Sequence, residues 1–249
     1  MAPITDHPLR YKLANELHAR PFPSMTAPCS AVYLAIKMPN DAVSRDRGKD
    51  LDHLTALLDR HGAPHPQPGA THYYGQIGKH WLKWEQHTEF VTYTAFSEAG
   101  MNRPFDPADF EVFPTDWLDA APGQRITSAM LHIVQMPAQE AEVGKHLDAW
   151  FVTESLAAAS VLDDAAVVAG DFRIDLNGHL RFAVFTRTDT TARRIGRIVQ
   201  RLCEIETYKT MSMLGFARVG EMRPDLGALE QRLTDLISEH GYRTQFENR

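Results

Sequence analysis

The sequence has few cysteines, no long apolar run and no export signal. Its 249 residues include only Cys29 and Cys203. Each stands in an apolar stretch with no second cysteine nearby, so we expect buried thiols and neither a disulfide framework nor a cysteine-based metal motif. No run reaches the roughly 18 apolar residues that a membrane-spanning helix needs. These absences predict a soluble, cytoplasmic chain.

Positive charge and the common catalytic motifs are also scarce. The formal net charge is −6 and the pI is about 6.0, whereas nucleic-acid-binding surfaces are usually basic. We therefore expect no nucleic-acid partner. The sequence contains no P-loop, no G-x-G-x-x-G after a strand, no G-x-S-x-G elbow and no H-E-x-x-H. Because these motifs are absent, the sequence identifies no cofactor, and a role other than catalysis is favoured.

The order of apolar and turn residues predicts an α+β fold of two β-α-β-β halves followed by C-terminal helices. In the first half, a strand (30–38) and a helix (43–61) precede a hairpin that turns at Gly78-Lys79. In the second half, a strand (126–135) and a helix starting near Pro137 precede a hairpin that turns at Asn177-Gly178. The repeated order suggests an internal duplication as a hypothesis.

These elements suggest four segments. They are an N-terminal arm (1–28), a first half with a cover loop (29–124), a second half (125–190) and a helical hairpin or stalk (191–249). The last segment is expected to hold one helix over 191–214 and another over 225–240. Leu226, Leu229, Leu233 and Leu236 follow a 3-4-3 spacing, which favours packing along a partner helix and predicts self-association through the C-terminal helices.

The most unusual segment is Trp81–Phe90. If it is one strand, Lys83, Glu85, His87 and Glu89 share a face. Two carboxylates beside a histidine suit a divalent metal such as zinc, manganese or iron, or an acid–base pair. His18 is a further candidate ligand. The alternative is a solvated strand face whose charges form weak surface pairs.

Two groups of arginines are candidate binding residues. Arg20 follows Glu16 and His18 in the arm, where a guanidinium can hold a carboxylate or a phosphate, or can tie the arm to the body through salt links. Arg193, Arg197 and Arg201 recur every four residues and share a helix face. That stripe can meet an anionic lipid surface or a phosphate, or it can be a solvated face paired with nearby acids.

Several segments resemble a family of bacterial proteins of unknown function, described as predicted membrane-anchored proteins (domain of unknown function 3422). The resembling segments are residues 7–10, 16–21, 83–90, 171–175, 196–202 and 204–208. Family members are longer and carry hydrophobic helices near the C-terminus. The resemblance implies that this chain is the soluble region of a membrane-anchored protein, with the membrane reached through segments outside it. It supplies no catalytic residues.

The leading interpretation is a non-enzymatic module that senses a ligand or binds a partner at the cytoplasmic face of the bacterial inner membrane. One alternative is a metal-binding regulatory domain of a transporter or channel, which requires His18 or another distant ligand to approach His87. Another is a hydrolase that uses Glu85, His87 and Glu89 as acid and base, although no nucleophile motif accompanies them.

Overall fold

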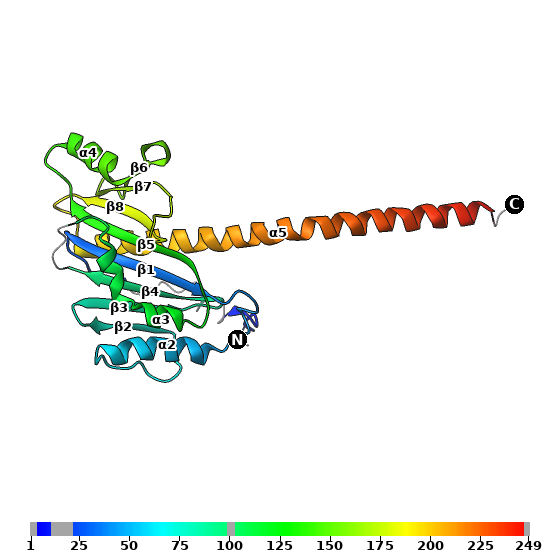
Figure 1. The fold of residues 1–249 in the computed structure, drawn as a ribbon, viewed down its shortest axis with the longest axis horizontal. Helices are drawn as coiled ribbons and strands as arrows, with labels where there is room; N and C mark the ends of the chain where they lie inside the picture. The colour runs from blue at the N-terminus through cyan, green and yellow to red at the C-terminus, as the bar shows by residue number, and fades with distance from the viewer. Residues whose placement is uncertain (1–3, 11–21, 99–102, 247–249) are drawn as a thin grey trace. The chain divides into compact units, whose positions relative to one another are not determined.

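A single mixed sheet of eight strands organises the fold (Figure 1). The structure is a computed structural model, which describes residues 4–10, 22–98 and 103–246. The strand order across the sheet is β2-β3-β4-β1-β5-β8-β7-β6. In chain order the strands are β1 (Cys29–Lys37), β2 (His72–Ile77), β3 (His80–Gln86), β4 (Phe90–Ser97), β5 (Gln124–Gln135), β6 (Ala157–Val161), β7 (Ala166–Gly170) and β8 (Leu180–Thr186).

Helices connect and cover these strands. They are α2 (Arg47–Arg60), η1 (Pro107–Val112), α3 (Thr115–Asp119), α4 (Glu140–Trp150), η2 (Thr153–Ser155) and α5 (Ala192–Phe246). Asp46 caps α2 by accepting a hydrogen bond of 2.9 Å from the Gly48 amide. The chain divides into two compact units, residues 1–207 and residues 208–249. The sheet belongs to the first unit, and the second consists of the later part of α5.

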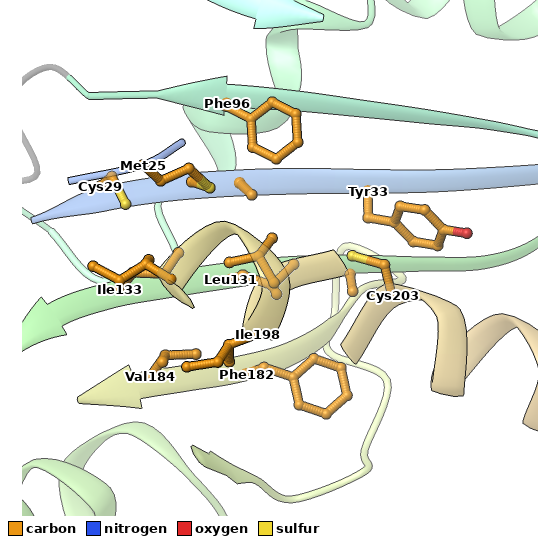
Figure 2. Close-up of a cluster of buried hydrophobic side chains, with 14 of the residues drawn as sticks. Met25, Cys29, Tyr33, Phe96, Leu131, Ile133, Phe182, Val184, Ile198 and Cys203 are labelled. Carbon is orange, nitrogen blue, oxygen red and sulfur yellow. The ribbon is translucent and has the colours of Figure 1, made fainter. Parts of the chain in front are cut away.

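One face of the sheet, here called the α5 face, packs against residues 192–207 of α5. Alternate residues of a strand point to opposite sides, and Cys29, Ala31, Tyr33 and Ala35 of β1 define this face. Their buried cluster (Figure 2) also contains Met25, Phe96, Leu131, Ile133, Phe182, Val184, Ile195, Ile198, Val199 and Cys203. Burying each large apolar side chain contributes about 1.5–3 kcal/mol relative to its exposure.

The opposite face, here called the α2 face, is covered by α2, α3 and α4. Val32 of β1 pairs with Met130 of β5, so both point to this side. The helices contribute Leu54, Leu57 and Leu58 from α2, Trp117 from α3, and Val143 and Leu147 from α4. Apolar residues on alternate strand positions therefore build a helix layer on each side of the sheet.

The predicted α+β class is confirmed, and both predicted hairpins pair. Ile77 pairs with His80 across Gly78-Lys79, and Gly78 has a positive φ of 56° that suits its turn. The β7–β8 pair is antiparallel as expected, but β7 ends at Gly170 and residues 171–179 form a long connection. Strand β6 and helix α3 were not predicted.

The hypothesis of internal duplication is not confirmed. Each half has the order β-α-β-β-β rather than β-α-β-β, and each places its last strand beside its first. The strand directions differ, however: β4 is antiparallel to β1, whereas β8 is parallel to β5. A simple copy of the first half would keep the direction of that pair.

The prediction of two separate C-terminal helices is wrong, because the structure has one helix, α5. The sequence contains Pro224 and five glycines in this region, which are usual helix breakers. Pro224 lacks the amide that would donate to the Gly220 carbonyl, yet the helix continues through it. The same helix excludes a helical hairpin within α5, whereas the alternative of a stalk stays a prediction.

Candidate functional site

The α5 face is apolar over β1, β5 and β8 but becomes polar in the middle of β3 and β4. Lys83 pairs with Thr94, and Thr94 pairs with Tyr33, so all three share this face. By the same registers Glu85 lies beside Thr92. We call Lys83, Glu85, Thr92 and Thr94, together with Gln200 and Glu204 of α5, the polar patch. Lys83, Thr92 and Thr94 are buried, so each charge here needs a partner.

Hydrogen bonds connect the polar patch from β3 to α5. The Lys83 Nζ atom lies 3.1 Å from Glu85 Oε1 and donates to Gln200 Oε1 at 3.4 Å. Gln200 Nε2 in turn donates to Glu204 Oε1 at 2.6 Å. The patch therefore balances its lysine with carboxylates and ties the helix to the sheet.

The two cysteines lie in the apolar part of this face, and their predicted burial is confirmed. Both are free and buried. Burial raises the pKa of Cys29 to about 12, and the nearby Glu98 acts in the same direction. Burial also raises the pKa of Cys203 far above its usual range, while Lys83 opposes the shift. At neutral pH both thiols stay protonated, the form that is neither a nucleophile nor a metal ligand.

The expected face of Lys83, Glu85, His87 and Glu89 does not form, because β3 ends at Gln86. Residues 87–89 make a tight turn, in which the His87 amide donates to the Phe90 carbonyl at 2.8 Å. The His87 ring stacks on Phe90 with centroids 4.3 Å apart. Glu89 forms an ion pair of 3.0 Å with Lys37 of β1. A chain reversal therefore sends these side chains in different directions.

No group of three or more histidine, cysteine, aspartate or glutamate side chains within 4–10, 22–98 and 103–246 is placed to hold a metal. Glu85, His87 and Glu89 are thus not brought together as such a group in this part of the chain. His18 and Arg20 lie outside the described residues. A site completed by His18, and an anion site at Arg20, stay predictions from the sequence.

Arg45 is the residue at this turn that the sequence did not indicate. It pairs with Asp50 at 2.9 Å, and their side chains are 3% and 4% exposed. Its guanidinium also donates to the carbonyls of His87 at 2.8 Å and Phe90 at 3.2 Å. Burial raises the pKa of Asp50, although Arg45 opposes this shift. Arg45 thus fastens the β3–β4 turn to α2. Its acceptors in the turn are backbone carbonyls some forty positions away. Because backbone carbonyls are present at every residue, this role could not be recognised from the sequence.

The predicted arginine stripe is exposed on α5. Arg193, Arg197 and Arg201 all lie on the solvent side of the helix. The Arg197 guanidinium lies 5.2 Å from the centre of the Phe22 ring, in cation–π geometry. The Arg201 Nε atom is 4.0 Å from Glu204 Oε2. Two members of the stripe therefore contact neighbouring side chains, and binding of lipid or phosphate there stays a prediction.

A second buried polar group joins β8 to the end of α4. The Arg181 Nη2 atom donates to Asp171 Oδ2 at 2.9 Å, and the Asp171 side chain is fully buried. Asp171 also accepts from the Val152 amide at 3.1 Å. The neighbouring His132 is 4% exposed, and no hydrogen bond to its Nδ1 atom occurs within the described ranges. Burial lowers the pKa of His132 to about 4, and His146 acts in the same direction.

The second unit, residues 208–249, exposes a regular row of apolar side chains. Val219, Met222, Leu226, Leu229, Leu233 and Leu236 follow one another at alternating spacings of three and four residues. We call this row the apolar seam. Each member is 46–62% exposed. The seam includes the four leucines whose spacing was noted in the sequence and extends that spacing to Val219 and Met222.

The described helices include none that is long and apolar enough to cross a membrane. No curated protein and no solved structure matches the chain. One family does match, over residues 5–248, and is described as a protein of unknown function, DUF3422. Because this match spans almost the whole sequence, the chain belongs to the DUF3422 family.

Proposed function

We propose that the chain is a non-enzymatic partner-binding module whose partner is a second copy of itself. In this proposal the apolar seam of α5 is the contact surface. The observation that carries it is the exposure of six large apolar side chains in a strict three–four repeat. Such a repeat keeps one stripe of a helix in contact with a partner helix along its whole length.

Water contact at the exposed apolar seam favours its burial against a partner. Large contiguous apolar surfaces are uncommon on monomeric soluble proteins and mark sites of interaction. A helix without a packed face is also weakly stable in water, because most helical stability in proteins comes from tertiary packing. Partner binding would cover Leu226, Leu229 and their neighbours and stabilise the helix at the same time.

The sheet-containing unit has a different part in this proposal. Its buried charges, among them Lys83, Glu85, Arg45 and Asp50, are engaged with one another and with the backbone. These contacts support a rigid scaffold that carries α5. The placement at the cytoplasmic face of the bacterial inner membrane, with attachment through segments outside this chain, is part of the same proposal.

Light scattering coupled to size exclusion tests the proposal on the whole chain. We expect the molar mass to rise toward twice 28.1 kDa with concentration. The double variant Leu226→Glu with Leu233→Glu should remain at the monomer mass, because burying unpaired carboxylates is costly. The control is Ala217→Glu with Ala228→Glu, which adds the same charge at exposed positions off the seam.

Two outcomes would contradict the proposal. A wild-type chain that stays monomeric at every concentration would remove the second copy as the partner. A control variant that dissociates as completely as the seam variant would show that added charge, rather than loss of the seam, causes the effect. Circular dichroism should show the same folded sheet in all three proteins.

A further inference from the structure

The charges beside the apolar seam indicate how two copies would be oriented. Resting on the proposed self-association, we propose that the two α5 helices pair antiparallel, with the two-fold axis crossing the helix between Gly227 and Ala228. In a two-stranded coil, charged residues that flank the apolar stripe set the orientation and register. The flanking residues of this helix favour one orientation on both sides of the seam.

In this arrangement every seam residue lies opposite a seam residue of the second copy. Around the proposed axis, Leu226 lies opposite Leu229 of the second copy. The next layers outward place Met222 opposite Leu233, and Val219 opposite Leu236. Two-fold symmetry repeats each layer with the copies exchanged. All six seam residues, each about half exposed in the single chain, would be covered over a length of about 26 Å.

The charged flanks are complementary in this register. On one side of the seam, Asp225 lies opposite Arg232 of the second copy. On the other side, Arg223 lies opposite Glu230. All four side chains are exposed in the single chain and are free to reach across the interface. Symmetry doubles both contacts, so two helices in this arrangement form four ion pairs.

The same residues oppose a parallel arrangement. In a parallel pair, a flanking residue meets the residue five positions later on the other copy. Arg218 would then face Arg223, and Asp225 would face Glu230. Both are like-charge pairs, and symmetry doubles them to four. A parallel pair would therefore have four repulsive contacts, whereas the antiparallel pair has four attractive ones.

Two exposed apolar residues outside the seam fit the antiparallel register as well. Phe216 is 70% exposed and Ile237 is 64% exposed. Both occupy the same flank as Arg223 and Glu230. With the axis between Gly227 and Ala228, Phe216 lies opposite Ile237 of the second copy, at each end of the coil. This contact extends the apolar surface beyond the six seam residues.

Disulfide trapping distinguishes the orientations on the intact chain. Met222→Cys and Leu233→Cys are made separately, one with a size tag, and mixed under mild oxidation. An antiparallel pair brings positions 222 and 233 together, so the mixture should give the tagged–untagged disulfide and neither variant should cross-link alone. A parallel pair separates these positions by about 16 Å, beyond the reach of a disulfide. It would instead cross-link each variant to itself.

Charge reversal gives an independent test with an opposite sign for the two orientations. Asp225→Arg places like charges opposite Arg232 in the antiparallel pair, and we expect the dimer Kd to rise about tenfold. Adding Arg232→Asp should restore it. In a parallel pair the same Asp225→Arg change would face Glu230 and tighten the dimer.

The results separate this inference from the proposed function. A dimer that cross-links each cysteine variant to itself, or that tightens with Asp225→Arg, overturns the antiparallel arrangement and leaves self-association standing. A chain that is monomeric by light scattering overturns both. Three results together establish the antiparallel pair. They are a disulfide between the Met222→Cys and Leu233→Cys variants, a weaker dimer with Asp225→Arg, and restoration of the dimer by Arg232→Asp.

Discussion

Lys83 and Glu85 form an ion pair on the α5 face, with Nζ and Oε1 3.1 Å apart and side chains 7% and 14% exposed. From the sequence, Glu85 was either a candidate metal ligand with His87 and Glu89 or part of a solvated strand face with weak surface pairs. In the structure its charge serves to balance a lysine that the sheet and α5 bury together. The pair therefore belongs to the interior of the scaffold, where its removal has a defined cost.

Breaking this pair from one side should destabilise the fold more than removing both charges. We expect Lys83→Met or Glu85→Gln alone to lower the free energy of unfolding by about 3 kcal/mol, because a buried charge loses its partner. The double variant should lose less than the sum of the two. Urea unfolding followed by circular dichroism measures these values.

The exposed pair between Arg60 and Asp116, 2.6 Å apart, is the control for that measurement. Arg60→Met should change stability by less than about 1 kcal/mol, because solvent screens the pair. Additive effects of Lys83→Met and Glu85→Gln would show that the two side chains do not interact energetically.

Arg45 should not be replaceable by lysine. Arg45→Lys keeps the charge but loses the planar fork that donates to Asp50 and to the carbonyls of His87 and Phe90. We expect a loss of about 2–3 kcal/mol in the free energy of unfolding. Hydrogen exchange should accelerate at the amides of the β3–β4 turn. The exposed neighbour Arg47 provides the matched Arg→Lys control, and equal effects at the two positions would argue against the role given to Arg45.

Stability should fall in mild acid because of His132. Its pKa in the folded protein is about 4, against a reference of 6.5, so the unfolded chain takes up the proton first as pH decreases. The contribution is complete above pH 6.5 and is lost between pH 6.5 and pH 4. Its size is about 3 kcal/mol.

His132→Leu isolates this contribution from the other buried histidines, His53 and His179, whose pKa values burial also lowers. Between pH 7 and pH 4 the variant should lose about 3 kcal/mol less stability than the wild type. At pH 7 it should be at least as stable, since the unpaired Nδ1 atom is removed. Parallel pH profiles for the two proteins would contradict this account.

At Gly196, α5 closely approaches the segment before β1. A Cβ atom added there would lie 1.7 Å from the Pro23 carbonyl oxygen. Gly196→Ala should therefore cost about 2–3 kcal/mol as the two backbones separate. Gly144 in α4 has nothing within 4 Å of an added Cβ, so Gly144→Ala should instead stabilise by about 0.5–1 kcal/mol. Thermal unfolding of both variants checks the opposite signs, and a neutral Gly196→Ala would show that the contact yields freely.

The elements that were predicted well are those whose pattern is local. The alternation in β1, the apolar spacing of α2 and the turn residues Gly78 and Gly178 were each enough to predict an element and its approximate bounds. The three–four leucine spacing was also readable, because a helix surface depends only on residues a few positions apart.

The predictions failed where residues far apart in the sequence determine the local structure. The segment from Trp81 to Phe90 looked like one strand, but Arg45 holds a turn at residues 87–89 with its guanidinium. Two helices were predicted over 191–214 and 225–240, but a single helix continues through Pro224 and the glycines between them. Strand β6 has little apolar pattern of its own and forms by pairing with β7.

Local order along the chain was thus sufficient for the α+β class, the positions of most strands and the seam of α5, since periodicity and turn chemistry act over a few residues. Tertiary structure alone decided how the two predicted hairpins join into one sheet, that β8 runs parallel to β5, and that Glu89 pairs with Lys37. The physical reason is that burial and hydrogen bonding join groups far apart in sequence. A charged side chain acquires its role only when folding determines its partner.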